Sequence, residues 1–225
     1  MSATTNAVLI LASLIGALNF GAAVYYETNL NPLQRKTGRV SDFGGPWKFL
    51  TFINLWVQLA FHLLHLLSTF LPAIKRARDL FFESLAFPAG MLVAVMFWSL
   101  YAIDRELVYP EIIDKYVPVA VNHMEHSVMV PLILLHSLLW RMRPCNLALS
   151  LAITAAGILA YLGWILYIGY TLDLWVYPIL NELAGVQFGA FIGGAAVVGI
   201  ALNVCGRALQ IREADTKVND YRKSQ

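Results

Sequence analysis

The strongest constraint on this chain is a series of long apolar segments, each about the length that a helix needs to cross a lipid bilayer. A helix of about 20 residues spans roughly 30 Å of hydrocarbon. We therefore predict six transmembrane helices, at 7–26, 48–71, 80–103, 117–140, 147–172 and 185–209. Because only short connections separate them, residues 1–225 are expected to form one all-α domain, a single six-helix bundle.

The composition excludes a soluble domain. Hydrophobic residues make up 59% of the chain and charged residues 13%, which is too apolar for a soluble surface. A net charge of +2 without a basic face excludes nucleic acid as a partner. The first apolar segment has no basic leader, so it is interpreted as a retained helix. We expect a multi-pass protein of the plasma membrane or endoplasmic reticulum. The two cysteines, Cys145 and Cys205, are interpreted as free thiols.

Basic residues predict the orientation, since Lys and Arg are retained in cytoplasmic flanks. More of them lie on the side that holds the N-terminus, namely Lys75, Arg76, Arg78, Arg141, Arg143, Arg207, Arg212, Lys217, Arg222 and Lys223. The other side carries Arg35, Lys36, Arg39, Lys48, Arg105 and Lys115, together with most of the acidic residues. We expect both termini to be cytoplasmic.

Proline and glycine mark irregular or closely packed places. Pro131 is expected to open the backbone next to His126, because it cannot donate to the carbonyl of Ser127. Gly185, Gly189 and Gly193 form a bare stripe, which predicts packing within the bundle or, alternatively, a dimer face. The oligomeric state is left open. The repeated "VYP" after the third and fifth segments indicates either related helical hairpins or aromatic anchors at the lipid interface.

Polar side chains at membrane depth are costly, so their positions point to function. In the second helix they recur every three or four residues and share one face, at Thr51, Asn54, Gln58, His62 and His65. The fourth helix carries Asn122, His123, Glu125, His126 and His136. Counted from the same outer side at 1.5 Å per residue, Thr51 lies roughly 6 Å deep, His123 about 9 Å and His126 about 14 Å. With ordinary helix tilt, Thr51 and His126 can meet.

Four functions are compatible with these residue types. A histidine can activate a threonine hydroxyl as a nucleophile. The pairs His62–His65 and His123–His126 have the spacing of metal ligands, but their different depths argue against one shared ion. A polar path for a transporter, or a proton relay, is the third possibility. The fourth is a non-catalytic regulatory membrane protein, in which the polar residues only hold helices together.

Several longer motifs resemble the family of androgen-induced and androgen-dependent tissue-factor-pathway-inhibitor-regulating proteins. They are "GGPWKFLTFINL" (Gly44–Leu55), "FPAGMLVAVMFWSLYAIDRELVYP" (Phe87–Pro110), "NHMEHSVMVPLILL" (Asn122–Leu135) and "WVYP" (Trp175–Pro178). The resemblance implies a six-helix membrane hydrolase that cleaves fatty acid esters of hydroxy fatty acids. It also implies Thr51 as the nucleophile and His126 as its histidine partner.

The resemblance leaves the supporting residues open. Asn122, His123 and Glu125 are candidates for orienting His126, while Lys48, Asn54 or a backbone amide near a helix start are candidates for stabilising an oxyanion. At the position of Asn54 a related member has Asp, so no acid role is carried over to it. Arg105 or Lys48 is a candidate for binding the free carboxylate of the lipid substrate. We expect neither a cofactor nor a metal ion.

Overall fold

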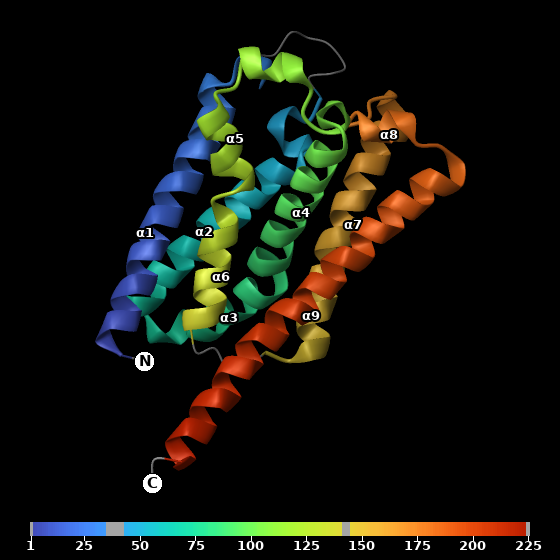
Figure 1. The fold of residues 1–225 in the computed structure, drawn as a ribbon. Helices are drawn as coiled ribbons and strands as arrows, with labels where there is room; N and C mark the ends of the chain where they lie inside the picture. The colour runs from blue at the N-terminus through green and yellow to red at the C-terminus, as the bar shows by residue number, and fades with distance from the viewer. Residues whose placement is uncertain (1, 35–42, 141–144, 224–225) are drawn as a thin grey trace.

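The computed structural model describes residues 2–34, 43–140 and 145–223, with side chains as far as Gln210. Within these ranges the chain forms helices and no β-strand, and both ends of the described chain lie at the same end of the molecule (Figure 1). The α-helices are α1 (Ala3–Tyr25), α2 (Leu50–Phe70), α3 (Lys75–Phe81), α4 (Phe87–Ile103), α5 (Val119–His126), α6 (Met129–Leu139), α7 (Leu147–Leu172), α8 (Ile179–Glu182) and α9 (Gly185–Lys223).

Short helical turns connect or extend these helices. Two π-helical turns, Tyr26–Leu30 and Phe82–Ala86, continue α1 and join α3 to α4. Single 3₁₀ turns occur in the connections, at Pro32–Gln34, Gly45–Lys48, Pro72–Ile74, Arg105–Leu107 and Glu111–Lys115.

Five helical stretches are long and apolar enough to cross a membrane, at Ala3–Leu30, Leu50–Phe70, Pro72–Ile103, Leu147–Leu172 and Gly185–Gln210. They coincide with five of the predicted segments, although the third begins earlier than residue 80. The chain is therefore a helical integral membrane protein.

The prediction of one continuous helix over 117–140 is wrong. The segment consists of α5 and α6, separated by a turn at Ser127 and Val128. The backbone N–H groups of both these residues donate to the carbonyl of His123, at 2.9 and 3.1 Å. The cause is Pro131, which has no N–H to give to the Ser127 carbonyl. That carbonyl instead accepts from Val130 N–H at 3.1 Å, as in a tighter turn. The backbone therefore opens next to His126, as the proline predicts.

A second proline fixes a contact between helices. Pro88 stands in the first turn of α4 and cannot donate to the carbonyl of Ser84, four residues earlier. The Thr154 hydroxyl of α7 donates to this carbonyl at 2.6 Å. A helical hydrogen bond that is lost in one helix is thus replaced by a bond from a neighbouring helix.

The buried amide of Asn203 connects α9 to the same region. Its Nδ2 group lies 2.7 Å from Thr154 Oγ1, 3.0 Å from Ser150 Oγ and 3.1 Å from the Glu83 carbonyl. One turn further along α9, Arg207 forms an ion pair with the Glu83 carboxylate at 2.8 Å. These contacts hold α9 against α7 and the π-helical turn before α4.

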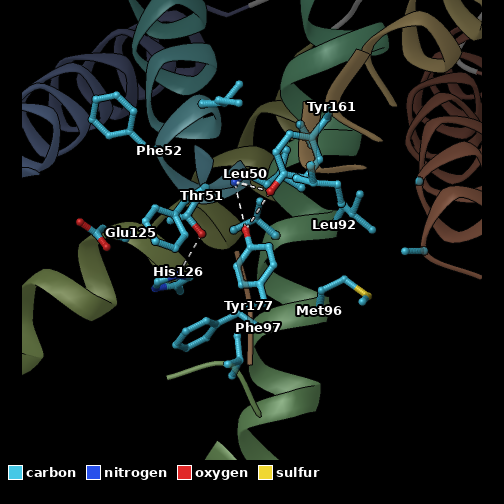
Figure 2. Close-up of a pocket in the computed structure, with 18 of the residues that line it drawn as sticks. Leu50, Thr51, Phe52, Leu92, Met96, Phe97, Glu125, His126, Tyr161 and Tyr177 are labelled. Atoms are coloured by element: carbon cyan, nitrogen blue, oxygen red, sulfur yellow. Dashed lines mark hydrogen bonds between the residues drawn. The ribbon is translucent and has the colours of Figure 1, made fainter. Parts of the chain in front are cut away.

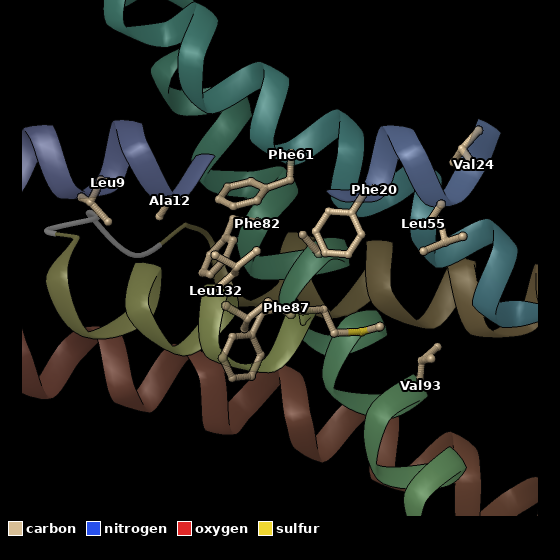
Figure 3. Packing of buried hydrophobic residues seen from close by; sticks show 14 of the residues in the cluster. Leu9, Ala12, Phe20, Val24, Leu55, Phe61, Phe82, Phe87, Val93 and Leu132 are labelled. Atoms are coloured by element: carbon tan, nitrogen blue, oxygen red, sulfur yellow. The ribbon is translucent and has the colours of Figure 1, made fainter. Parts of the chain in front are cut away.

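Aromatic and aliphatic side chains fill the space between α1, α2, α4 and α6 (Figure 3). Phe20, Phe61 and Phe82 are completely buried there, and the rings of Phe61 and Phe82 are 4.6 Å apart. Gly16 of α1 lies so close to His62 of α2 that an added Cβ atom would overlap the imidazole ring. The close approach of these two helices therefore depends on glycine.

The glycine stripe at the start of α9 does not pack against the rest of the bundle. Nothing among the described residues lies within 4 Å of a Cβ atom placed on Gly185, Gly189 or Gly193. The expected packing within the bundle is therefore wrong at these positions. Close contacts occur further along α9 instead, where Gly199 faces Ile158 and Gly206 faces Phe87.

Part of the basis for the orientation lies outside the described residues. Arg35, Lys36, Arg39, Arg141 and Arg143, which entered the comparison of basic residues, fall in the undescribed ranges. Cys145 is buried and Cys205 is exposed, and both are free thiols.

We predict that Asn203→Ala lowers the free energy of unfolding by about 1–2 kcal/mol, because it removes the donor shared by three oxygen atoms. Thermal unfolding in detergent micelles should show a Tm lower by roughly 2–8 °C. Asn181→Ala, at an exposed position, is the matched control. An unchanged Tm for Asn203→Ala would contradict the role given to this amide.

Candidate active site

The structure brings Thr51 and His126 into contact. Thr51 lies in the first turn of α2, and His126 is the last residue of α5. Thr51 Oγ1 is 3.2 Å from His126 Nε2 (Figure 2). A hydroxyl within hydrogen-bond reach of an imidazole nitrogen is the arrangement that activates a nucleophile.

The hydrogen bond of the other ring nitrogen, Nδ1, determines which tautomer the neutral His126 ring adopts. His126 Nδ1 lies 3.0 Å from the backbone carbonyl of Asn122. A carbonyl only accepts hydrogen bonds, so Nδ1 carries the hydrogen of the neutral ring. The lone pair of Nε2 then faces Thr51 and can accept the hydroxyl proton. A backbone group, and not a charged side chain, orients this histidine.

Packing holds the imidazole in place. The His126 ring lies on the Phe97 ring with the centroids 3.6 Å apart and an angle of 16° between the planes. Trp98 Nε1–H donates to the backbone carbonyl of His126 at 3.3 Å. This carbonyl is available because Val130 N–H, its partner in a continuous helix, bonds to Ser127. The break after α5 and the position of the ring are therefore linked.

Both residues line a cavity of about 360 Å³ between the helices. Its walls come from α2, α4, α5, α7, α9 and the loops above them, and most of the lining residues are apolar. The polar members of the described lining are Glu27, Asn31, Thr51, Ser84, Tyr109, Glu125, His126, Thr154, Tyr161 and Tyr177. A cavity of this kind suits a long apolar molecule that presents a polar group to Thr51.

Two tyrosines cover the start of α2 next to Thr51. Leu50 N–H lies 3.0 Å from the hydroxyl oxygens of both Tyr161 and Tyr177 (Figure 2). The Tyr161 hydroxyl donates to the Lys48 carbonyl at 3.2 Å and lies 3.2 Å from the Tyr177 hydroxyl. Burial raises the pKa of Tyr177, which lies in the connection after α7. Its hydroxyl therefore keeps its proton as a hydrogen-bond donor.

Sequence reasoning missed these tyrosines. Tyr177 belongs to the "WVYP" motif, whose aromatic residues also suit an anchor at the lipid interface. The motif was the available signal, but its position over the start of α2 depends on how α7 packs. Tyr161 lies on an apolar helix and has no pattern that distinguishes it.

The three residues of the fourth predicted helix that were candidates for orienting His126 lie in different surroundings. Asn122 acts through its backbone carbonyl, while its side-chain Oδ1 is buried without a hydrogen-bond partner. His123 is exposed, bonds through Nδ1 to Ser127 Oγ at 3.0 Å, and stacks on Trp98 outside the cavity lining. Glu125 is buried and lines the cavity.

The side-chain candidates for binding the oxyanion or the substrate carboxylate are not among the described residues that line the cavity. Asn54 is completely buried outside the cavity lining, where its Nδ2 lies 3.2 Å from Met129 Sδ and its Oδ1 accepts from Gln58 at 3.0 Å. The Nζ atom of Lys48 lies 5.4 Å from the centre of the Phe49 ring. Arg105 forms an ion pair with Asp114 at 2.9 Å and donates to the Tyr109 carbonyl. Neither cation is among the described residues that line the cavity.

The remaining histidines form a separate cluster at the level of Phe61. The His136 ring lies 5.4 Å from His62 and 5.1 Å from His65, and His136 Nε2 lies 3.1 Å from Ser13 Oγ. His136 thus joins His62 and His65, and none of the three lines the cavity. Within the described part of the chain, no group of three His, Cys, Asp or Glu residues is arranged to hold a metal ion.

The chain matches the family model described as FAR-17a/AIG1-like protein over residues 8–211. It belongs to this family. It is 28% identical to the human androgen-induced gene 1 protein over 191 residues, which cover 78% of this chain and 80% of the relative. Identity to the human androgen-dependent TFPI-regulating protein is 30%, with coverage of 74% and 76%. For the protein of the same name from Rattus norvegicus it is 32%, with coverage of 82% and 84%.

No solved structure matches the chain. The names of the FAR-17a/AIG1 relatives state no reaction.

We predict that the cavity binds a long-chain lipid and that Ala89→Trp, which places a large ring at its wall, weakens this binding at least about fivefold. The reason is steric, since an indole fills much of a volume of about 360 Å³. Displacement of a fluorescent fatty acid from the purified protein measures the effect.

Ala190→Trp, at an exposed position of α9 outside the lining, should bind the probe like the wild type. Equal affinities for the two variants would show that the probe does not enter this cavity.

Proposed function

We propose that the protein is an intramembrane hydrolase that cleaves fatty acid esters of hydroxy fatty acids. The observation that carries the proposal is the hydrogen bond between Thr51 Oγ1 and the Nε2 atom of a histidine whose Nδ1 is held by a backbone carbonyl. The contact lies at the wall of a mostly apolar cavity, which suits the apolar part of an ester next to the reacting bond. The resemblance of the motifs to those of membrane hydrolases supplies the reaction and substrate class.

The first half of the reaction forms an acyl-threonine. His126 Nε2 accepts the proton of the Thr51 hydroxyl as Oγ1 attacks the ester carbonyl. The imidazolium donates through Nδ1 to the Asn122 carbonyl and through Nε2 to the leaving oxygen. The C–O bond of the ester then breaks, and the hydroxy fatty acid leaves with that proton.

Water completes the reaction. His126 takes a proton from a water molecule, which attacks the acyl-threonine, and Thr51 regains its proton when the fatty acid leaves. No step requires a cofactor or a metal ion. Access to the cavity is from the lipid phase, since both substrate and product are apolar.

The donor for the oxyanion lies beside the start of α2. Leu50 N–H already points to the two tyrosine hydroxyls, and the positive end of the helix dipole lies beside Thr51. Because the single Tyr161 proton is donated to the Lys48 carbonyl, the Tyr177 hydroxyl donates to Tyr161 in the contact between the two hydroxyls, and this proton turns from Tyr161 to the substrate oxyanion when the ester is bound. Tyr177 therefore takes the role that was open between Lys48, Asn54 and a backbone amide.

The α5–α6 segment supplies a sixth crossing in this proposal. With six crossings both termini lie on one side of the membrane, in agreement with the position of the two ends of the described chain (Figure 1). The excess of Lys and Arg on that side supports a cytoplasmic location for it. The membrane is the plasma membrane or the endoplasmic reticulum. Thr51 then lies in the outer half of the bilayer.

We predict that Thr51→Ala and His126→Ala each lower kcat at least about 10³-fold, because either change removes the activated nucleophile. Hydrolysis of a hydroxy-fatty-acid ester in detergent or liposomes measures this. A fluorophosphonate probe should label the wild type and fail to label Thr51→Ala. The exposed Thr69→Ala variant is the control for loss of a threonine, and normal hydrolysis by Thr51→Ala would refute the mechanism.

We predict that Tyr177→Phe lowers kcat by about 10²-fold with little change in KM, as expected for a donor that acts on the transition state. The steady-state parameters of the purified variant give the answer. Tyr170→Phe, which removes a hydroxyl from an exposed ring, should match the wild type. A change in KM alone would assign Tyr177 to ground-state binding.

A further inference from the structure

The cavity is elongated, and one part of it extends far from the reacting pair. Its lining follows α4 over several turns, beginning in the π-helical turn before that helix. His126 lies at the level of Phe97, since the two rings stack. Leu85 of the π-helical turn precedes Phe97 by twelve residues, which is about 18 Å along a helix axis. Leu92 and Met96 line the cavity between these levels (Figure 2). The far end of the cavity, next to Leu85, is therefore about 18 Å from the reacting histidine.

The polar side chains at the far end, Ser84 and Thr154, already have their hydrogen-bond partners within the protein. Ser84 Oγ donates to the Leu80 carbonyl at 2.6 Å. Thr154 Oγ1 donates to the Ser84 carbonyl at 2.6 Å and accepts from Asn203 Nδ2 at 2.7 Å. The far end therefore suits the apolar tail of a ligand, whereas the polar group of that ligand belongs beside Thr51.

The width of the far end depends on a glycine. Gly157 of α7 lines the cavity, and a Cβ atom placed on it would lie 3.6 Å from Leu85 Cδ2. A longer side chain at this position would occupy the space beside Leu85. Spread over the length of the cavity, a volume of about 360 Å³ corresponds to a narrow tube. Such a tube suits one unbranched alkyl chain.

The chemistry of the ester indicates which of its two chains enters this tube. The acyl chain is unbranched and begins at the carbonyl carbon that Thr51 attacks. The alcohol oxygen is attached to an internal carbon of the hydroxy fatty acid, which carries two arms, and one of them ends in the carboxyl group. A narrow apolar tube accepts the first and not the second. The acyl chain also remains bonded to Thr51 after the alcohol has left.

We propose that the far end of the cavity holds the acyl chain of the ester, and that Gly157 and Leu85 set the longest chain that fits. This inference rests on the proposed function and deepens it, because it names the part of the substrate that is selected. An extended palmitoyl chain is close in length to the separation between the levels of Phe97 and Leu85. The hydroxy fatty acid part stays outside the far end.

A series of esters tests the proposal with the full-length protein in detergent micelles. All are esters of the same hydroxystearic acid, with an octanoyl, palmitoyl or behenoyl acyl chain. The kcat/KM of the wild type should increase from octanoyl to palmitoyl, because each added methylene buries more apolar surface. It should not increase further to behenoyl, whose chain is longer than the far end. A continued increase, or equal values for all three, would overturn the proposal.

Two variants should shift the chain-length preference in opposite directions, which a general folding defect cannot do. In Gly157→Leu the ratio of kcat/KM for palmitoyl to that for octanoyl should fall at least about tenfold, because the added side chain fills the space beside Leu85. In Leu85→Ala the ratio of behenoyl to palmitoyl should rise about fivefold, because the far end becomes longer. Partition of each substrate into micelles is the same for every variant, so the ratios compare the cavities.

Gly163→Leu is the matched control on the same helix. Gly163 lies outside the lining, and nothing among the described residues is within 4 Å of a Cβ atom placed on it. This variant should keep the wild-type ratios. An equal loss for all chain lengths in Gly157→Leu would indicate blocked entry and contradict the proposal, as would unchanged ratios.

A second series shows which chain lies inside. It keeps the palmitoyl group and varies the length of the hydroxy fatty acid. Within this series Gly157→Leu should show the same relative kcat/KM values as the wild type. If it discriminates by the length of the hydroxy fatty acid instead, the alcohol part occupies the far end and the assignment is wrong.

A binding measurement separates this inference from the proposed reaction. In the Thr51→Ala background, octanoate and palmitate compete with a fluorescent fatty acid, and adding Gly157→Leu should lower the affinity for palmitate relative to octanoate at least about fivefold. If Thr51→Ala hydrolyses normally but this shift occurs, the reaction mechanism is wrong and the acyl-chain site stands. If hydrolysis is lost and the shift is absent, the mechanism stands and the acyl-chain site is wrong.

Discussion

A backbone group that leaves its helical hydrogen bond inside a membrane must find another partner in the protein, because no water is available there. Three places in this chain show the consequence. The carbonyl of Ser84 accepts from Thr154, the carbonyl of His126 accepts from Trp98, and the amide of Leu50 donates to two tyrosine hydroxyls. Each of these bonds joins two different helices or a helix and a loop.

The candidate site is made from two of these irregular places. The first turn of α2 brings Thr51 next to Tyr161 and Tyr177, and the end of α5 presents His126 against Phe97. In a continuous helix the His126 carbonyl would bond to Val130, and no partner on α4 would be required. The break thus joins α5 to α4 at the residue that faces Thr51.

Much of the fold could be predicted from the sequence, because long apolar segments have few stable arrangements in a bilayer. Helix rise and ordinary tilt allowed Thr51 and His126 to meet from depths of roughly 6 and 14 Å, but the choice of this pair came from the family resemblance. The turn at Ser127 and Val128 could be predicted only in part. Pro131 shows which backbone hydrogen bond is missing, but it does not show which bonds the neighbouring residues form instead. Tyr177 and Glu27 could not be placed, because each lies beyond a helix end, where neither periodicity nor depth applies. For the same reason the sequence left Arg105 as a candidate for the substrate carboxylate and did not show that Asp114 is its partner.

The contact between Pro88, Ser84 and Thr154 has a consequence for how the helices recognise one another. Two apolar helix surfaces in lipid can pack in several registers of similar energy, since each register brings similar apolar atoms into contact. A proline changes this by leaving one carbonyl free at a fixed position along its helix, and only a neighbouring helix with a hydrogen-bond donor at that position can satisfy it. Pro88 therefore helps to set the register of α4 against α7, because the Ser84 carbonyl that it leaves free is satisfied by Thr154 of α7.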